Sequence, residues 1–208
     1  GTGDCADAGH RARTEPLKHG ALLASVLCCA LMSGPALAVE LRAIEVTRGE
    51  SRYRVRMDVQ LDVPAPAAYA VFADISRLPR INPAVREARV LEEPVAEGLR
   101  RVYTDLRVCG SFFCRRLQQV QDMRFTARPD GGDVQAVVIP ERSDLRYGLA
   151  NWALRDCGGR TCLHFEAELE PHFWVPPVIG PWLMQRKLRE EAMQTSAGIE
   201  RLARASTP

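Results

Sequence analysis

Hydrophobic and polar residues alternate without a break between positions 53 and 63 of the chain. Successive side chains of a β-strand point to opposite faces, so this period of two predicts a strand with one buried face. The residues of that face include Val55, Met57, Val59 and Leu61.

The C-terminal part of the chain has a helical period instead. From Trp182 to Ala205 there is no proline, and apolar residues recur at steps of three, four and seven. This spacing predicts an amphipathic helix, about 35 Å long at about 1.5 Å per residue. Pro181 fits its first turn, where a missing N–H costs little. The stripe to be buried includes Met184, Leu188, Ala192, Ile199 and Leu202.

Between these segments the pattern predicts two short helices and then a run of strands. The helices are expected at 67–73 and 74–79, and the strands at 85–91, 99–108, 114–126, 134–140, 144–156 and 162–170. Short turns make successive strands antiparallel neighbours. The order predicts an α+β domain over residues 51–206, with the long helix across a curved antiparallel sheet of about seven strands. Residues 39–50 show no strong pattern and are expected to be a lead-in. The last strand would turn Leu163, Phe165, Ala167 and Leu169 to one face.

Residues 1–38 have the layout of a secretory signal peptide. Basic residues precede an apolar run at 21–32, and Ala36 and Ala38 supply the small residues of a cleavage site. The run is shorter than the roughly 20 residues that span a bilayer. We therefore expect cleavage after Ala38 and a periplasmic or otherwise exported protein. Anchoring in the inner membrane by an uncleaved leader is the alternative.

Cleavage would leave four cysteines, Cys109, Cys114, Cys157 and Cys162, in two C-x4-C pairs. An even number of cysteines in an exported chain favours disulfides, whereas zinc prefers closer spacing and a reducing compartment. Successive turns of an antiparallel meander alternate between the two ends of the sheet, so the two pairs should lie at opposite ends. Local pairing, Cys109 with Cys114 and Cys157 with Cys162, is therefore predicted.

Charge and histidine content exclude several classes of function. A formal net charge of +2 gives no basic field for nucleic acid. The mature chain has two histidines, His164 and His172, and neither has a nucleophile motif nearby, which argues against a Ser/Cys-His-Asp hydrolase. Alternate residues on a strand are about 7 Å apart, too far to converge on one ion. No metal site is therefore expected in the row His164, Glu166, Glu168 and Glu170, which we place on the solvated face.

Residues 63–85 and 171–177 carry a resemblance to a known family. The first segment combines a Pro-containing helix entry, an Asp74-x-x-x-x-Pro79 step and Asn82-Pro83 before the next strand; the second is a Pro-rich lead into the long helix. Together they resemble the START-like (SRPBCC) superfamily, and within it exported bacterial members of the polyketide cyclase/dehydrase and coenzyme Q-binding group. The resemblance implies a helix-grip fold, whose long helix closes a curved sheet over an apolar cavity.

The resemblance also implies which residues line that cavity. Tyr103, Tyr147, Asn151 and Trp152 would be the amphipathic groups that orient a ligand, or alternatively core residues with a satisfied polar tip. The full set is Val55, Met57, Val59, Leu61, Tyr103, Tyr147, Asn151, Trp152, Leu163, Phe165, Ala167, Met184, Leu188 and Ala192.

The function expected from this fold is binding, with transport or sequestration, of a hydrophobic small molecule such as a lipid or a quinone. No cofactor and no catalytic residue is predicted. One alternative is a cyclase/dehydratase acting on a polyketide-like chain, and another is an envelope interaction module with a filled core. Arg107, Arg115 and Arg116 beside the first cysteine loop would allow peripheral contact with anionic lipid head groups, although a solvated hairpin end is favoured.

Overall fold

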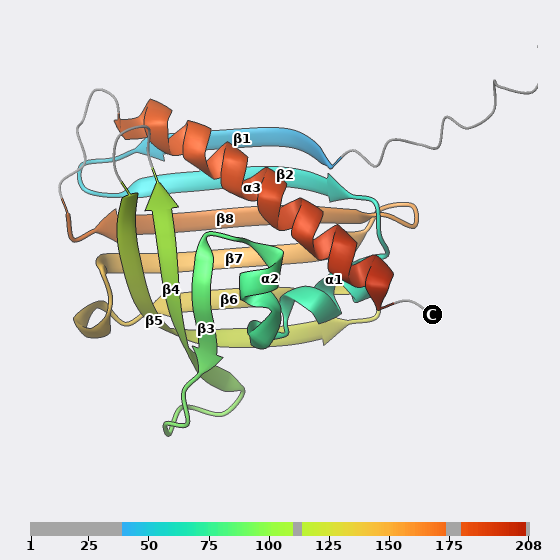
Figure 1. Cartoon of the computed structure of the whole chain (residues 1–208), viewed down its shortest axis with the longest axis horizontal. Coiled ribbons are helices and arrows are strands. Elements are labelled where there is room, and N and C mark those ends of the chain that lie inside the picture. The colour runs from blue at the N-terminus through green and yellow to red at the C-terminus, as the bar shows by residue number, and fades with distance from the viewer. Residues whose placement is uncertain (1–38, 110–113, 174–179, 207–208) are drawn as a thin grey trace, which may run out of the picture. The chain divides into compact units, whose positions relative to one another are not determined.

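The computed structural model describes residues 39–109, 114–173 and 180–206, with the backbone alone at positions 180, 181, 183 and 184. These residues form one curved antiparallel sheet of eight strands, a long helix and several short ones (Figure 1). The strand order is β1-β2-β8-β7-β6-β5-β4-β3. The strands are β1 (Glu40–Arg48), β2 (Tyr53–Leu61), β3 (Val85–Val90), β4 (Leu99–Cys109), β5 (Cys114–Arg128), β6 (Gly131–Val138), β7 (Leu145–Asp156) and β8 (Thr161–Pro171). The helices are α1 (Ala65–Phe72), α2 (Leu78–Ile81), α3 (Gly180–Ala205) and the 3-10 turns η1 (Ile75–Arg77) and η2 (Pro140–Arg142).

The first strand corrects the expectation for residues 39–50. That segment is β1, which pairs with β2 along its whole length, so the sheet has eight strands where about seven were expected. The register shifts between Leu41 and Ala43. Because a bulge moves the following side chains by one position, the alternation in the sequence is interrupted there and its period is hidden.

Two short helices fill the concave side of the sheet beside α3. The ring of Tyr69 on α1 occupies the space that a side chain at position 132 of β6 would need. Because residue 132 is glycine, α1 can pack close to the sheet. Gly198 of α3 faces the backbone of Ile81, at the end of α2. A Cβ at Gly198 would stand 2.7 Å from the carbonyl carbon of Ile81, so only glycine allows this crossing.

The C-terminal half of α3 closes the core. Its buried residues Ile199, Leu202 and Ala203 pack in one cluster with Leu61, Leu154 and Leu163 of the sheet. Glu200 is also buried, and its carboxylate accepts a hydrogen bond from the backbone N–H of Asp62, 2.7 Å away. Towards its N-terminus α3 packs on β1, where Gln185 donates to the carbonyl of Ile44.

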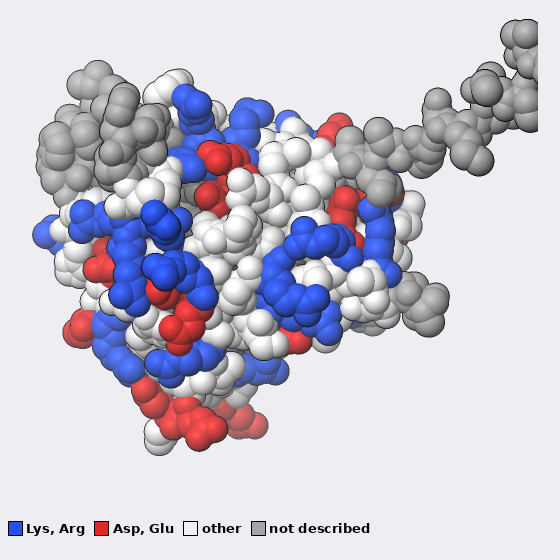
Figure 2. Space-filling model, in the orientation of Figure 1, with Lys and Arg blue, Asp and Glu red and all other residues white. Residues whose placement is uncertain are grey.

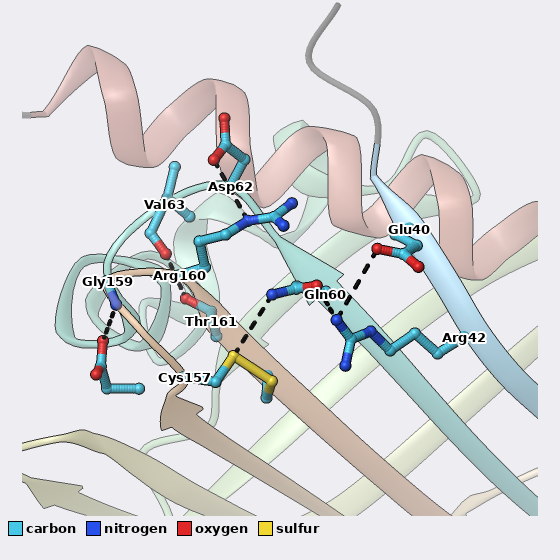
Figure 3. Close-up of a disulfide and its surroundings, with 11 residues drawn as sticks. Glu40, Arg42, Gln60, Asp62, Val63, Cys157, Gly159, Arg160 and Thr161 are labelled. Atoms are coloured by element: carbon cyan, nitrogen blue, oxygen red, sulfur yellow. Dashed lines mark hydrogen bonds and ion pairs between the residues drawn. A yellow bond between two sulfur atoms is a disulfide. The ribbon is translucent and has the colours of Figure 1, made fainter. Parts of the chain in front are cut away.

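Both predicted disulfides are present. Cys109 pairs with Cys114 at the β4–β5 hairpin, and Cys157 pairs with Cys162 at the β7–β8 hairpin, at the opposite end of the strands. Beside the second bridge, the side chain of Gln60 on β2 points at Cys157 and lies 3.8 Å from its sulfur (Figure 3). The bridge that closes the β7–β8 hairpin therefore also lies beside β2.

The convex face of β2 and β8 is a ladder of charges, as the row from His164 to Glu170 predicted. Arg56 pairs with Glu166 at 3.0 Å, and Arg52 pairs with Glu168 at 3.0 Å. His164 lies 2.7 Å from the carboxylate of Asp58, and this hydrogen bond raises the pKa of the imidazole. Within the described ranges no cluster of His, Cys, Asp and Glu could hold a metal ion.

Candidate functional site

The candidate site is the concave face of the sheet beneath α3. Strand register brings its predicted residues into rows, because partners in an antiparallel ladder share a face. Met57 is opposite Phe165, and Phe165 is opposite Trp152; Val55 is opposite Ala167, and Val59 is opposite Leu163. The structure thus brings together the predicted residues of β2 and β8, with Trp152 of β7. Leu61 ends the same face, in the closed part of the core.

Three predicted cavity residues lie on the opposite, convex face. Asn151 pairs with Glu166 in the ladder, and its amide oxygen accepts a hydrogen bond from Gln135. Tyr147 pairs with Glu170, and its ring lies 3.8 Å from the guanidinium of Arg52. Tyr103 pairs with Val120 and Arg89, and Gln118 donates to its hydroxyl. Their assignment to the cavity was therefore wrong: residues of one strand share a face only at even spacings, so Asn151 cannot join Trp152.

The helix residues of the predicted cavity have different surroundings. Ala192 is buried, with 5% of its surface exposed. Leu188, one turn earlier, is only partly buried. Met184 lies outside the residues whose side chains are described.

Small residues form the centre of the concave face. Ala167 of β8 pairs with Ala150 of β7, which pairs with Ala136 of β6. Helix α3 packs mainly on β1, β2, α1 and α2, whereas α1 packs on β6 and β7 further along the strands. Ala150 and Ala167 lie between these covered regions and are only partly buried. The prediction from the sequence missed Ala150, although its even spacing from Trp152 places it on the same face.

Aromatic rings bound this row of alanines on one side. The ring centroids of Trp152 and Phe165 are 5.1 Å apart, and those of Trp152 and Phe72 are 5.6 Å apart. All three side chains are partly buried rather than closed over. Alanines beside partly buried aromatic rings make an apolar surface of the kind that lines sites for hydrophobic ligands.

A separate hollow of about 530 Å³ lies between α1, η1 and strands β3 and β4. Ala70, Ile75, Ala88 and Val90 form much of its lining, and Arg100 stands at its edge. None of the predicted cavity residues contributes to it. On the face that carries α3, uncharged surface runs between two groups of Lys and Arg side chains (Figure 2).

Among the described residues no helix is long and apolar enough to cross a membrane.

Known structures share this architecture. The Zhui aromatase/cyclase from Streptomyces sp. R1128 superposes with a TM-score of 0.58 at 15% identity, covering 74% of this chain and 94% of its own. A STAR-related lipid transfer protein fragment from Xanthomonas axonopodis gives 0.53 at 14% identity, covering 78% and 97%. A protein of Thermus thermophilus gives 0.58 at 14% identity, covering 74% and 99%. At such identities the likeness establishes the fold.

Sequence comparison identifies the family. No curated protein sequence matches the chain significantly. The family model described as "Polyketide cyclase / dehydrase and lipid transport" matches residues 61–196, from the end of β2 to the second half of α3. The match spans well over half of the chain and includes the β8 and α3 residues of the concave site. The helix-grip architecture and this match together show that the chain belongs to the polyketide cyclase/dehydrase and lipid transport family of START-like proteins.

Proposed function

We propose that the protein binds a hydrophobic small molecule, lipid-like or quinone-like, between the concave face of the sheet and α3. The observation that carries this proposal is the alanine floor beside Trp152 and Phe165, which lies between the regions covered by α1 and α3. Exposed apolar surface in a recess favours a ligand that removes it from water. Burying some 300 Å² of apolar ligand surface contributes up to about 7 kcal/mol before association costs, at about 25 cal/mol per Å².

A cyclase/dehydratase is the alternative that the family includes, and the positions of the histidines favour binding over it. Such an enzyme needs an acid or base against its substrate, and histidine fills this role most often. His164 lies on the convex face beside Asp58. His172 is exposed, with its ring nitrogen 3.4 Å from Arg146.

The binding proposal is tested by filling the recess with Ala150→Leu. In an open recess the larger side chain adds no strain, so thermal unfolding stays unchanged while binding of the uncharged fluorescent probe N-phenyl-1-naphthylamine is lost. Ala153→Leu is the matched control, because Ala153 is on the same strand and faces the convex side. It should keep probe binding.

The contrary outcome is a filled core, as in an envelope interaction module. Overpacking a filled core costs about 1–3 kcal/mol. A clear fall in the melting temperature of Ala150→Leu, with no probe bound by the wild type, would therefore contradict the proposal. Organic extraction of protein purified from its native host, followed by mass spectrometry, would identify a bound ligand directly.

We also propose that the protein is exported and works in the periplasm or an equivalent compartment. Two disulfides support this proposal, because such bridges persist in oxidising compartments. Protein isolated from its native host should begin at Val39, as found by N-terminal sequencing. A chain that keeps residues 1–38 and is recovered from the cytoplasm would contradict it.

A further inference from the structure

The two ends of the concave face differ in chemistry. At the end that carries Leu61 and Leu154, the inner residues are apolar except for Thr161 opposite Leu61, whose hydroxyl donates to the carbonyl of Val63. At the other end, where β2 and β4 carry Tyr53 and Thr104, several inner residues are polar. We call this second region the polar end; its members are Tyr53 on β2, Thr104 on β4, and Gln119 and Gln121 on β5.

Strand register places these four residues on the concave side. Tyr53 is opposite Leu169, two residues from Ala167 of the alanine floor. Gln121 is opposite Val102, a buried core residue, and Gln119 is opposite Thr104. Because positions two apart on a strand share a face, the four side chains continue the concave surface beyond the alanines.

Among the residues that the structure describes, two of these side chains are buried without a hydrogen-bonding partner. Tyr53 is 2% exposed and Thr104 is 5% exposed. In the described part of the chain, neither the hydroxyl of Tyr53 nor that of Thr104 meets a donor or an acceptor. Leaving a buried polar group unpaired is unfavourable, and nearly all such groups in folded proteins have partners. Two of them at the same end of one concave face suggest that the missing partner is a ligand.

The amides at the polar end are also available. Gln119 and Gln121 are partly buried, and no hydrogen bond of either side chain occurs among the described residues. The nearby guanidinium of Arg48 lies 5.5 Å from the centre of the Tyr53 ring, against the ring rather than the hydroxyl. The unpaired groups are therefore hydroxyls and amides, which match uncharged oxygen atoms better than a carboxylate or a phosphate.

We propose that the ligand is an amphiphile with an uncharged, oxygen-bearing head group, a hydroxyl or a carbonyl. The head group hydrogen-bonds to Tyr53 and Thr104 at the polar end, and the tail lies along the alanine floor towards Trp152 and Phe165. This inference rests on the proposed function, since it orients the ligand within the same recess. It makes Tyr53 and Thr104 specificity-determining residues.

The experiment compares three ten-carbon competitors of the N-phenyl-1-naphthylamine probe: 1-decanol, decanoate and 1-chlorodecane. They share the chain and differ in whether the end is a neutral hydroxyl, an anion or a group without a strong hydrogen bond. The wild type should bind 1-decanol about tenfold more tightly than 1-chlorodecane, as one buried hydrogen bond to the ligand implies. Decanoate should bind less tightly than 1-decanol, because burying an unpaired charge is unfavourable.

Variants then assign the preference to the polar end. Tyr53→Phe and Thr104→Val should each reduce, several-fold, the ratio of the affinity for 1-decanol to that for 1-chlorodecane. The melting temperature should be unchanged or raised, because each variant removes an unpaired buried hydroxyl. Tyr147→Phe is the matched control on the convex face and should keep the tenfold ratio.

Other outcomes would contradict the head-group inference alone or the binding proposal as well. Equal binding of 1-decanol and 1-chlorodecane by the wild type overturns the inference and leaves the proposed function standing. Tighter binding of decanoate than of 1-decanol likewise overturns it, in favour of an anionic head group. A melting temperature lowered by Tyr53→Phe would show that the hydroxyl has a structural partner. A protein that binds neither probe nor competitor contradicts both proposals.

Discussion

The crossing of α2 and α3 at Gly198 makes a quantitative prediction for Gly198→Ala. In an exposed helix this change would stabilise the protein by about 1 kcal/mol, because glycine is a poor helix former. Here the new Cβ would stand 2.7 Å from the carbonyl carbon and 2.8 Å from the Cα of Ile81, and closer still to its carbonyl oxygen. Since both neighbours are backbone, no side-chain rotation relieves the clash, and the two helices must separate.

Overpacking costs about 1–3 kcal/mol, and because backbone must move here we take the upper part of that range, about 2–3 kcal/mol. After the gain in helix propensity is deducted, we expect a net loss of about 1–2 kcal/mol. For a protein of this size that loss corresponds to a fall in melting temperature of about 2–8 °C. Thermal unfolding followed by circular dichroism measures it.

The neighbouring residue supplies a matched control. Ala197 is exposed on α3, so Ala197→Gly loses about 1 kcal/mol of helix propensity without any clash. If the close contact with Ile81 excludes a side chain at position 198, Gly198→Ala and Ala197→Gly both destabilise the protein, although one adds a methyl group and the other removes one. A melting temperature raised by Gly198→Ala would refute the close approach of α2 and α3.

The remaining predictions concern the disulfides and the convex face. Replacing Cys109 and Cys114 together by serine, or Cys157 and Cys162 together, should lower the free energy of unfolding by about 2 kcal/mol, as loop-closure entropy gives for so short a loop. Non-reducing peptide maps should show the two local bridges, and a peptide linking Cys109 to Cys157 would contradict the pairing. For His164, the hydrogen bond to Asp58 raises the pKa of the folded state. Its stabilising effect is therefore complete below the unfolded pKa of about 6.5, and is lost as the pH rises through the raised pKa. Asp58→Asn should thus lower the melting temperature more at pH 5 than at pH 9; an equal effect at both pH values would argue against a charged pair.

Local patterns in the sequence carried much of the fold. The alternation in residues 53–63 identified β2 and its buried face, because the period of a strand is a property of the backbone and needs no partner. The helical spacing after Trp182 identified α3 in the same way. The cysteine pairs were predictable since each spans a single hairpin, whose turn alone brings both residues together.

Residue spacing could also have corrected part of the predicted site. Asn151 and Trp152 are adjacent on β7 and cannot both face the recess. Ala150 is two residues from Trp152 and therefore lies on the same face. For Tyr103 and Tyr147, spacing alone was insufficient. Their faces follow from the pairing of β4 with β5 and of β7 with β8, which depends on register across the whole sheet.

Other features were decided only by tertiary structure. The bulge in β1 hides its period, and the pairing with β2 makes it a strand. Glu200 is buried although it is charged, because the turn after β2 presents the N–H of Asp62 to its carboxylate. Gly198 interrupts the helical pattern in the sequence, and only the backbone of Ile81 explains why a side chain is excluded there. The unpaired hydroxyls of Tyr53 and Thr104 belong to strands far apart in sequence. Whether a buried polar group has a partner depends on every element around it, so the polar end of the recess follows from the curvature and coverage of the sheet.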